Sequence, residues 1–214
     1  MENIRTIGTI GAGQIGTAVA RLAVAAGYDV VLSNSRGPET LADLVAELGP
    51  RASADTAVGA ATRGDLVVVT IPLHAIGDVP VAPLAGKIVV DTNNYYAARD
   101  GQHPELDDHS ETSSGLLQRH LPDAHVVKAF NHIASTELET DGTPAGTPGR
   151  RALAVYGDDA AAVDTVSAWL DELGYDTVQG GALTESWRIE PGTTGYGPRL
   201  DTDGLRQALA QESR

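Results

Sequence analysis

The sequence predicts an α/β fold, doubly wound around a mainly parallel sheet, with a short C-terminal extension. Short apolar runs alternate with helix-period segments along the chain, which is the pattern of a parallel sheet covered by helices on both faces. The 214 residues are also close to the size of one domain. We therefore expect a single domain over residues 1–214, in which residues 182–214 form an extension that packs on the core or on a partner subunit.

Two strand-helix units are visible in the first fifty residues. In each, a short apolar run is followed by a segment whose apolar residues recur with helical spacing. Gly27 is suited to end the first helix, and Pro38 is suited to the first turn of the second. The expected elements are strands at 5–10 and 29–33 and helices at 14–26 and 38–48.

The middle of the chain continues the alternation less regularly. A short helix capped by Asp55 precedes a continuous apolar run, which is typical of a strand buried on both faces. The polar residues 99–114 predict an exposed connection. The expected elements are a helix at 55–63, strands at 65–71, 87–91 and 125–130, and a helix at 114–120.

The last part of the chain predicts one more unit of two strands around a helix. It follows residues 140–150, which are rich in glycine and proline and therefore predict a loop. The expected elements are a strand at 152–156, a helix at 159–173, a strand at 175–178 and a final amphipathic helix at 203–211.

Composition and charge argue against several classes of partner. The formal net charge is −14, and the lysines of the chain are Lys87 and Lys128. Such a negative charge repels nucleic acids and anionic membranes. The absence of cysteine removes disulfides and thiolate chemistry and fits a reducing cytosol. No segment has the roughly 18 uninterrupted apolar residues of a membrane span. We expect a cytoplasmic protein with small-molecule partners, without nucleic-acid or membrane binding, and we assign no metal site.

Residues 11–16 read Gly-Ala-Gly-Gln-Ile-Gly and fit the pattern GxGxxG between the first strand and its helix. In this position Gly11 can make the tight turn, Gly13 lets a pyrophosphate approach the backbone, and Gly16 lets helix and strand pack closely. The N–H groups at the start of the helix attract phosphate. The motif predicts a Rossmann-type NAD(P)-binding fold, with a glycine-rich turn that binds nothing as the alternative.

The end of the second expected strand favours NADP over NAD. NAD-binding domains of this type carry an acidic residue about 20 residues after the motif, where it bonds the ribose hydroxyls. Here the chain reads Ser33-Asn34-Ser35-Arg36, without a carboxylate to repel a 2′-phosphate. The hydroxyls and the amide can donate to that phosphate, and the Arg36 guanidinium can clamp it. The alternative is a polar loop whose arginine points to solvent.

With the glycine motif, the SNSRG loop and the later TIP, VVKAFN and GD elements in this order, the chain resembles the family of NADPH-dependent reductases of deazaflavin coenzyme F-420. It is also similar to the cytosolic reductase domain of the six-transmembrane epithelial antigen metalloreductases. The resemblance extends over nearly the whole length. The deazaflavin reductases often have a histidine where this chain has Asn131, and the segment AFN is closer to the metalloreductase form.

The resemblance implies roles for particular residues. Residues 12–15 would cradle the pyrophosphate, Ser35 and Arg36 would hold the 2′-phosphate, and residues 70–72 would line the path to the nicotinamide. Segment 128–132 matches the place where the family brings a flavin-like ring against the nicotinamide. The predicted cofactor-binding residues are Gly11, Ala12, Gly13, Gln14, Ile15, Gly16, Asn34, Ser35, Arg36, Thr70, Ile71, Pro72, Ala129 and Asn131.

Three functions stay open at this point. The first is hydride transfer between NADPH and deazaflavin coenzyme F-420, or failing that FMN or FAD. Hydride transfer between stacked rings needs no acid or base, so we assign neither and expect Asn131 to position the ring. The second function is NADPH-dependent reduction of a small carbonyl or imine substrate. The third is a non-catalytic NADP-sensing module.

Several residues near strand ends have two interpretations. We interpret His74 and His132 as structural or surface histidines, with a catalytic role as the alternative. Asn94, Tyr95 and Tyr96 mark a place where a second ring could lie, or they form a simple turn. We expect a homodimer, because a lone domain of this type leaves its second pocket open.

Overall fold

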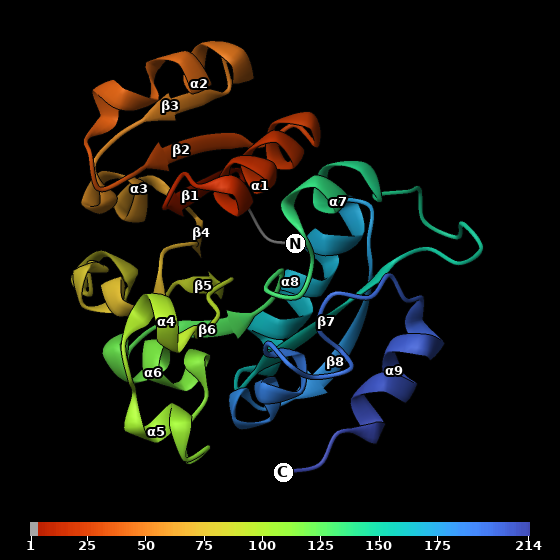
Figure 1. The fold of residues 1–214 in the computed structure, drawn as a ribbon. Helices are drawn as coiled ribbons and strands as arrows, with labels where there is room; N and C mark the ends of the chain where they lie inside the picture. Colours follow the sequence, from red (N-terminus) through yellow and green to blue (C-terminus); the bar gives the residue numbers. More distant parts are fainter. Residues whose placement is uncertain (1–3) are drawn as a thin grey trace.

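The computed structural model describes residues 4–214, and this part of the chain contains one eight-stranded sheet with the order β3-β2-β1-β4-β5-β6-β7-β8 (Figure 1). Neighbouring strands are parallel, except for β6 and β7, which are antiparallel. The predicted mainly parallel α/β fold is therefore confirmed. The strands are β1 (Thr6–Ile10), β2 (Asp29–Ser33), β3 (Ala52–Ala54), β4 (Leu66–Val69), β5 (Ile88–Asp91), β6 (His125–Lys128), β7 (Ala152–Gly157) and β8 (Asp176–Gly181).

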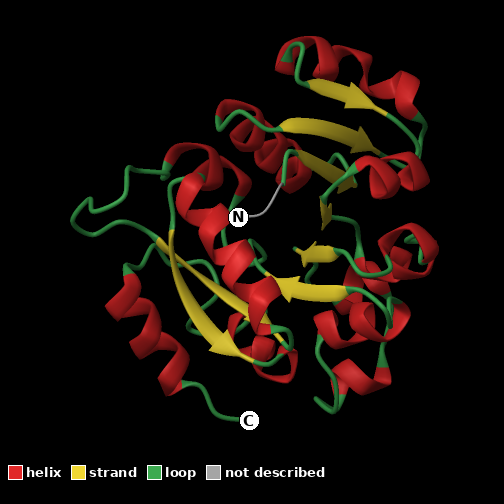
Figure 2. Cartoon of the chain, turned by 180° about the vertical axis from the view of Figure 1, so that it is seen from behind, coloured by secondary structure: helices red, strands yellow, loops and turns green. Residues whose placement is uncertain are grey.

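Helices cover both faces of the sheet (Figure 2). The α-helices are α1 (Gln14–Ala25), α2 (Ala42–Leu48), α3 (Ala57–Arg63), α4 (Ala97–Asp100), α5 (Pro104–Asp107), α6 (Ser113–His120), α7 (Ser135–Thr140), α8 (Ala160–Glu172) and α9 (Thr202–Gln211). The 3₁₀ helices are η1 (Pro38–Leu41), η2 (Leu73–Asp78), η3 (Ala82–Leu84) and η4 (Leu183–Ile189).

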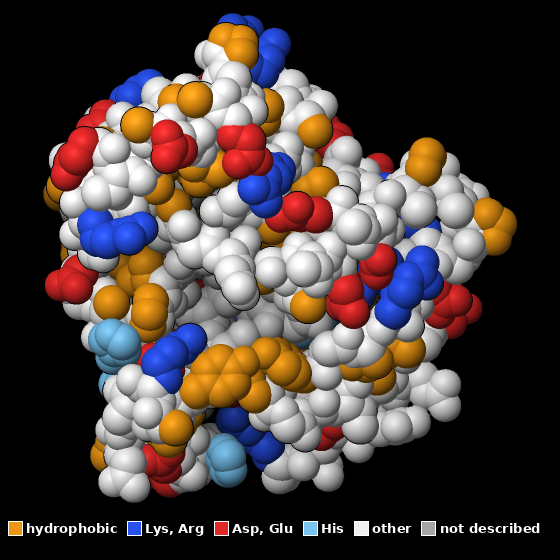
Figure 3. Space-filling view, turned by 45° about the horizontal axis from the view of Figure 1, so that its top comes forward, with side chains coloured by type: hydrophobic (Ala, Val, Ile, Leu, Met, Phe, Trp, Pro, Cys, Tyr) orange, Lys and Arg blue, Asp and Glu red, His pale blue; other side chains and the backbone are white. Residues whose placement is uncertain are grey.

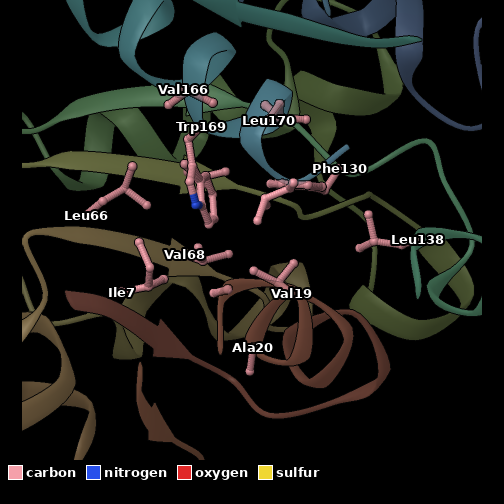
Figure 4. Packing of buried hydrophobic residues seen from close by; sticks show 14 of the residues in the cluster. Ile7, Val19, Ala20, Leu66, Val68, Phe130, Leu138, Val166, Trp169 and Leu170 are labelled. Carbon is pink, nitrogen blue, oxygen red and sulfur yellow. The ribbon is translucent and has the colours of Figure 1, made fainter. Parts of the chain in front are cut away.

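The core is divided between the two faces because successive side chains of a strand point in opposite directions. In β4, Val68 packs with Trp169 of α8 and Val19 of α1 on one face, as Figure 4 shows. Val67, one residue earlier, packs with Leu117 of α6 on the other face. Burial on both faces explains why this strand has no polar alternation.

The C-terminal extension contacts the sheet through α9. Leu205 and Leu209 of this helix pack with Ala154 and Val178 of β7 and β8. The next residue of β7, Val155, belongs to the cluster that includes α8, so α8 and α9 lie on opposite faces of this pair of strands. Figure 1 shows α9 on the side of β7 and β8 that is away from α8.

Some expected elements differ from the structure. Residues 99–114 do not form a simple exposed connection, because they include α5 and bury Asp100 and Leu106. The N-cap of α3 is Thr56, whose side chain accepts a hydrogen bond from Gly59 N. Asp55 instead accepts from Thr56 N at 2.7 Å, so its assignment as the cap was wrong by one residue. The helix expected at 38–48 is divided into η1 and α2.

Candidate functional site

Two adjoining cavities lie at the carboxyl ends of β1, β2, β4, β5 and β6. The first, of about 580 Å³, is lined by residues 10–13, 33–36 and 70–72 together with His74. The second, of about 590 Å³, is lined by residues 13–15, 70–71, 92–94 and 130–131 and by Tyr96, Arg99 and Tyr196. Because Gly13, Thr70 and Ile71 line both, the cavities form one groove where ligands of doubly wound folds collect. Figure 3 shows a hollow near the middle of one face, with hydrophobic side chains along its lower edge.

The three glycines of the motif have different surroundings. Gly11 has a φ of +107°, and a Cβ there would lie 2.1 Å from Thr70 O. A Cβ on Gly16 would lie 2.3 Å from Gly11 O, whereas a Cβ on Gly13 would meet nothing within 4 Å. The protein itself therefore requires glycine at 11 and 16. At Gly13 the empty space belongs to the groove, as a site for a pyrophosphate requires.

The start of α1 faces the same space. Gly13 is its N-cap and supplies no side-chain hydrogen bond, and the first turn carries no acidic residue. A helix of 12 residues with its first N–H groups uncapped offers donors and partial positive charge to an anion. This local site is the feature that a strongly acidic protein needs to bind phosphate.

The loop after β2 divides its polar groups between structure and groove. The Ser33 hydroxyl is buried and donates to a carbonyl oxygen of β1 at 2.7 Å. Asn34 accepts from Arg36 N at 3.0 Å and donates to Thr40 Oγ1 at 2.9 Å. The single hydroxyl proton of Ser33 is therefore used within the protein, which corrects the expectation that this hydroxyl donates to a ligand. Asn34 orders the loop but uses only one of its two N–H donors, so its contact with a ligand stays a prediction. Ser35 and Arg36 are exposed, and no carboxylate within residues 4–214 forms an ion pair with Arg36.

The second cavity has an aromatic wall built from distant parts of the chain. The hydroxyls of Tyr96 and Tyr196 are 2.5 Å apart, and the Arg99 guanidinium lies 5.0 Å from the centre of the Tyr96 ring. Burial and the hydrogen bond with Tyr96 raise the pKa of Tyr196. Since Tyr196 belongs to the C-terminal extension, this extension contributes directly to the groove.

Asn131 lines the second cavity, but its amide is engaged within the protein. It is 4% exposed. Its Nδ2 donates to Asn94 Oδ1 at 3.1 Å and to Ile189 O at 2.6 Å, and its Oδ1 is 3.2 Å from His132 Nδ1. Asn131 therefore joins three segments of the wall. Ala129, two residues earlier, is fully buried in the core.

His132 is a buried neutral histidine. Its Nε2 accepts a hydrogen bond from Ala154 N at 3.1 Å, so the proton lies on Nδ1, which faces Asn131. Burial, reinforced by the positive charges of Arg151 and Lys128, lowers the pKa of His132 to about 3. The structural interpretation of this residue agrees with its surroundings.

Comparison with known proteins identifies the family. The family model described as "NADP oxidoreductase coenzyme F420-dependent" matches residues 6–95, from β1 to the loop after β5. The chain belongs to this family. A hypothetical protein from Sinorhizobium meliloti, known from its crystal structure, is 30% identical, with a TM-score of 0.76 over 91% of this chain and 92% of that one. A proposed F420-dependent NADP reductase from Arthrobacter sp. is 26% identical, with a TM-score of 0.73 over 86% and 87% of the two chains.

Among curated proteins, metalloreductase STEAP3 from Rattus norvegicus is 27% identical over 190 residues, which is 86% of this chain and 35% of that protein. Protein YjhV of Escherichia coli is 43% identical over 53 residues, 39% of its length. The chain thus spans little more than a third of these two relatives. Within residues 4–214, no helix is long and apolar enough to cross a bilayer.

In this F420-dependent NADP oxidoreductase family member, a buried carboxylate connects the two cavities. Asp100 Oδ1 is 3.1 Å from His74 Nδ1, and Arg99 donates to both Asp100 oxygens at 2.9 and 2.8 Å. Burial raises the pKa of Asp100, but the hydrogen bonds from Arg99, Tyr96 N and His74 outweigh it and lower the pKa to about 2. Asp100 stays ionised and holds η2 against α4. Sequence reasoning missed it because residues 99–114 were expected to be exposed.

A second missed cluster lies behind the loop that follows β5. Lys128 and Asp91 form a fully buried ion pair with Nζ to Oδ2 at 3.3 Å. Lys128 also donates to Ser113 Oγ at 2.8 Å and to Asn93 O. Asp91 accepts from Ser114 Oγ at 2.6 Å and from Asn93 N at 2.9 Å. The sequence signal was the lysine within the apolar VVKAF run, because such a charge needs a buried partner.

Proposed function

We propose that this chain is an NADP(H)-dependent oxidoreductase that transfers a hydride between NADPH and a deazaflavin, or a related flavin. The observation that carries the proposal is the pair of adjoining cavities, which share Gly13, Thr70 and Ile71. A nucleotide in the first cavity would extend its nicotinamide toward the second. When bound, NADPH would supply a hydride to the acceptor ring, and a proton from solvent would complete the reduction at a ring nitrogen. The protein's contribution would be to hold the two rings in the orientation for transfer.

The residues of the first cavity fit NADP(H). Residues 11–15 would hold the pyrophosphate, since the open space at Gly13 and the uncapped start of α1 face the groove. Arg36 and Ser35 would hold the 2′-phosphate, with Asn34 ordering the loop around them. Residues 70–72 would lead from one cavity to the other. The buried Gly16 would support the turn through helix packing.

The second cavity fits a planar acceptor. Tyr96 and Tyr196 supply ring surface, and Asn131 fixes the wall between them and η4. The names of the family and of the Arthrobacter relative favour a deazaflavin. Tyr196 comes from the same chain, so this wall does not depend on a second subunit. The homodimer stays a prediction.

The test is anaerobic oxidation of NADPH by the purified protein with deazaflavin coenzyme F420, FMN, FAD or no acceptor, followed by absorbance. We expect saturable reduction of the deazaflavin. Turnover with small carbonyl or imine compounds alone would favour that class of substrate and contradict the proposal. Tight NADPH binding without turnover of any acceptor would indicate a sensing module.

Arg36→Ala is expected to weaken NADPH binding by about 1.5–3 kcal/mol, the scale of hydrogen bonds to a charged group, or roughly tenfold to a hundredfold. NADH affinity should change little, because NADH lacks the 2′-phosphate. Titration calorimetry with both nucleotides measures the difference. Arg51→Ala is the matched control: Arg51 is also exposed, pairs with Asp29 and does not line the groove. An equal loss for NADH and NADPH would contradict the 2′-phosphate assignment.

A further inference from the structure

Asn93 carries a donor that the protein does not use. The residue lines the second cavity and is 3% exposed. In residues 4–214, several buried side-chain nitrogen and oxygen atoms have no hydrogen-bond partner. Among these atoms, only Asn93 Nδ2 belongs to a residue that lines either cavity of the groove. Native proteins satisfy most such groups, so this nitrogen requires an explanation.

The orientation of the Asn93 amide is fixed by its neighbour. Its Oδ1 lies 3.1 Å from Ile71 N, and a backbone N–H can only donate. The oxygen must therefore face Ile71, because the reversed amide would bring two donors together. Nδ2 is then the atom left over, and it lies beside a residue that lines both cavities.

The backbone of Asn93 is held equally firmly. Its N–H donates to Asp91 Oδ1 at 2.9 Å, and its carbonyl oxygen accepts from Lys128 Nζ. Both partners are fully buried. With its backbone held on both sides and its Oδ1 engaged, Asn93 keeps Nδ2 in one fixed orientation, in a residue that lines the cavity.

We propose that Asn93 Nδ2 donates a hydrogen bond to the carbonyl oxygen of a ring bound in the second cavity. A buried donor without an acceptor is unfavourable, and an acceptor on the ligand removes that penalty. Amide-type carbonyls occur both on the nicotinamide and on flavin-like acceptor rings. The inference rests on the proposed function, and it makes Asn93 a positioning residue that selects ligands with an acceptor at this point.

Asn93→Asp removes the donor but keeps an acceptor at the same place. The aspartate keeps an oxygen for Ile71 N and nearly the same shape, but it replaces the donor with an acceptor. We measure the dissociation constant of NADPH and that of the deazaflavin for the protein saturated with NADP⁺. We expect one of these two constants to rise by about tenfold or more. A rise for NADPH assigns the carbonyl to the nicotinamide, and a rise for the deazaflavin alone assigns it to the acceptor.

Asn93→Leu separates the lost donor from the added charge. It also removes Nδ2 but introduces no charge, so it should weaken binding of the same ligand as Asn93→Asp does. It should lower the melting temperature more than Asn93→Asp, because Ile71 N loses its acceptor. Unchanged affinities in Asn93→Asp, or a loss in Asn93→Asp that is absent in Asn93→Leu, would overturn the inference. If the wild-type protein binds NADPH but no deazaflavin, the proposed acceptor fails, and the NADPH constants alone decide the role of Asn93.

Discussion

A Gly13→Val protein is expected to fold normally and to bind NADPH about a hundredfold more weakly, or worse. The protein leaves the space beside Gly13 empty, since a Cβ would meet no atom within 4 Å, and its φ of −80° and ψ of −163° suit valine. Losing glycine as the N-cap of α1 costs no more than about 1 kcal/mol. The branched side chain would instead occupy the place of the pyrophosphate. Titration with NADPH and thermal unfolding measure the two effects separately.

Gly16→Ala is the contrasting variant for thermal unfolding, because at this glycine the protein itself leaves no room for a side chain. Its Cβ would lie 2.3 Å from Gly11 O and 2.7 Å from Thr70 Cγ2, so α1 must shift away from β1. We expect a loss of about 1–3 kcal/mol in the free energy of unfolding from this overpacking. Normal NADPH binding by a well-folded Gly13→Val protein would show that the pyrophosphate does not lie at this turn.

The elements that the sequence predicted are those with a strong local signal. β2 was predicted at its observed bounds, because its apolar run is continuous. β3 was missed because Ala52, Ser53 and Ala54 have little strand propensity and become a strand only by pairing with β2. The helix α7 was missed because it is short and buries a single apolar residue, Leu138. The reversal between β6 and β7 depends on long-range pairing that periodicity does not encode.

The sequence predicted which residues line the groove better than it predicted the hydrogen bonds that their side chains make. The predicted residues 11–15, 34–36, 70–72 and 131 line the two cavities, because parallel strands bring their carboxyl ends to one edge. The sequence could not show that the Asn131 amide is engaged. Nor could it show that Asn93 has a free donor, since the chain reads Asn93-Asn94 and only tertiary contacts distinguish the two. Asn94 bonds Asn131 O, whereas Asn93 faces Ile71 and the cavity.

Lys128→Met is expected to lower the free energy of unfolding by about 3–5 kcal/mol, as removal of one partner of a buried ion pair does. Lys128 and Asp91 are both fully buried. The methionine fills most of the volume of the lysine stem, so the loss would come from the charge left on Asp91 and from the acceptors Ser113 Oγ and Asn93 O. Urea unfolding at neutral pH measures the change.

A double-mutant cycle identifies the cause of that loss. In Asp91→Asn/Lys128→Met the stranded charge is gone, and the asparagine oxygen can still accept from Asn93 N. We expect the double variant to be less destabilised than the sum of the two single variants by about 1–3 kcal/mol. Additive losses would show that packing, not charge, dominates. Lys128 also donates to Asn93 O. Under conditions in which both proteins are fully folded, we therefore expect the double variant to bind the ring that Asn93 contacts more weakly than the wild type does. That loss of affinity without loss of fold would connect the buried pair to the groove.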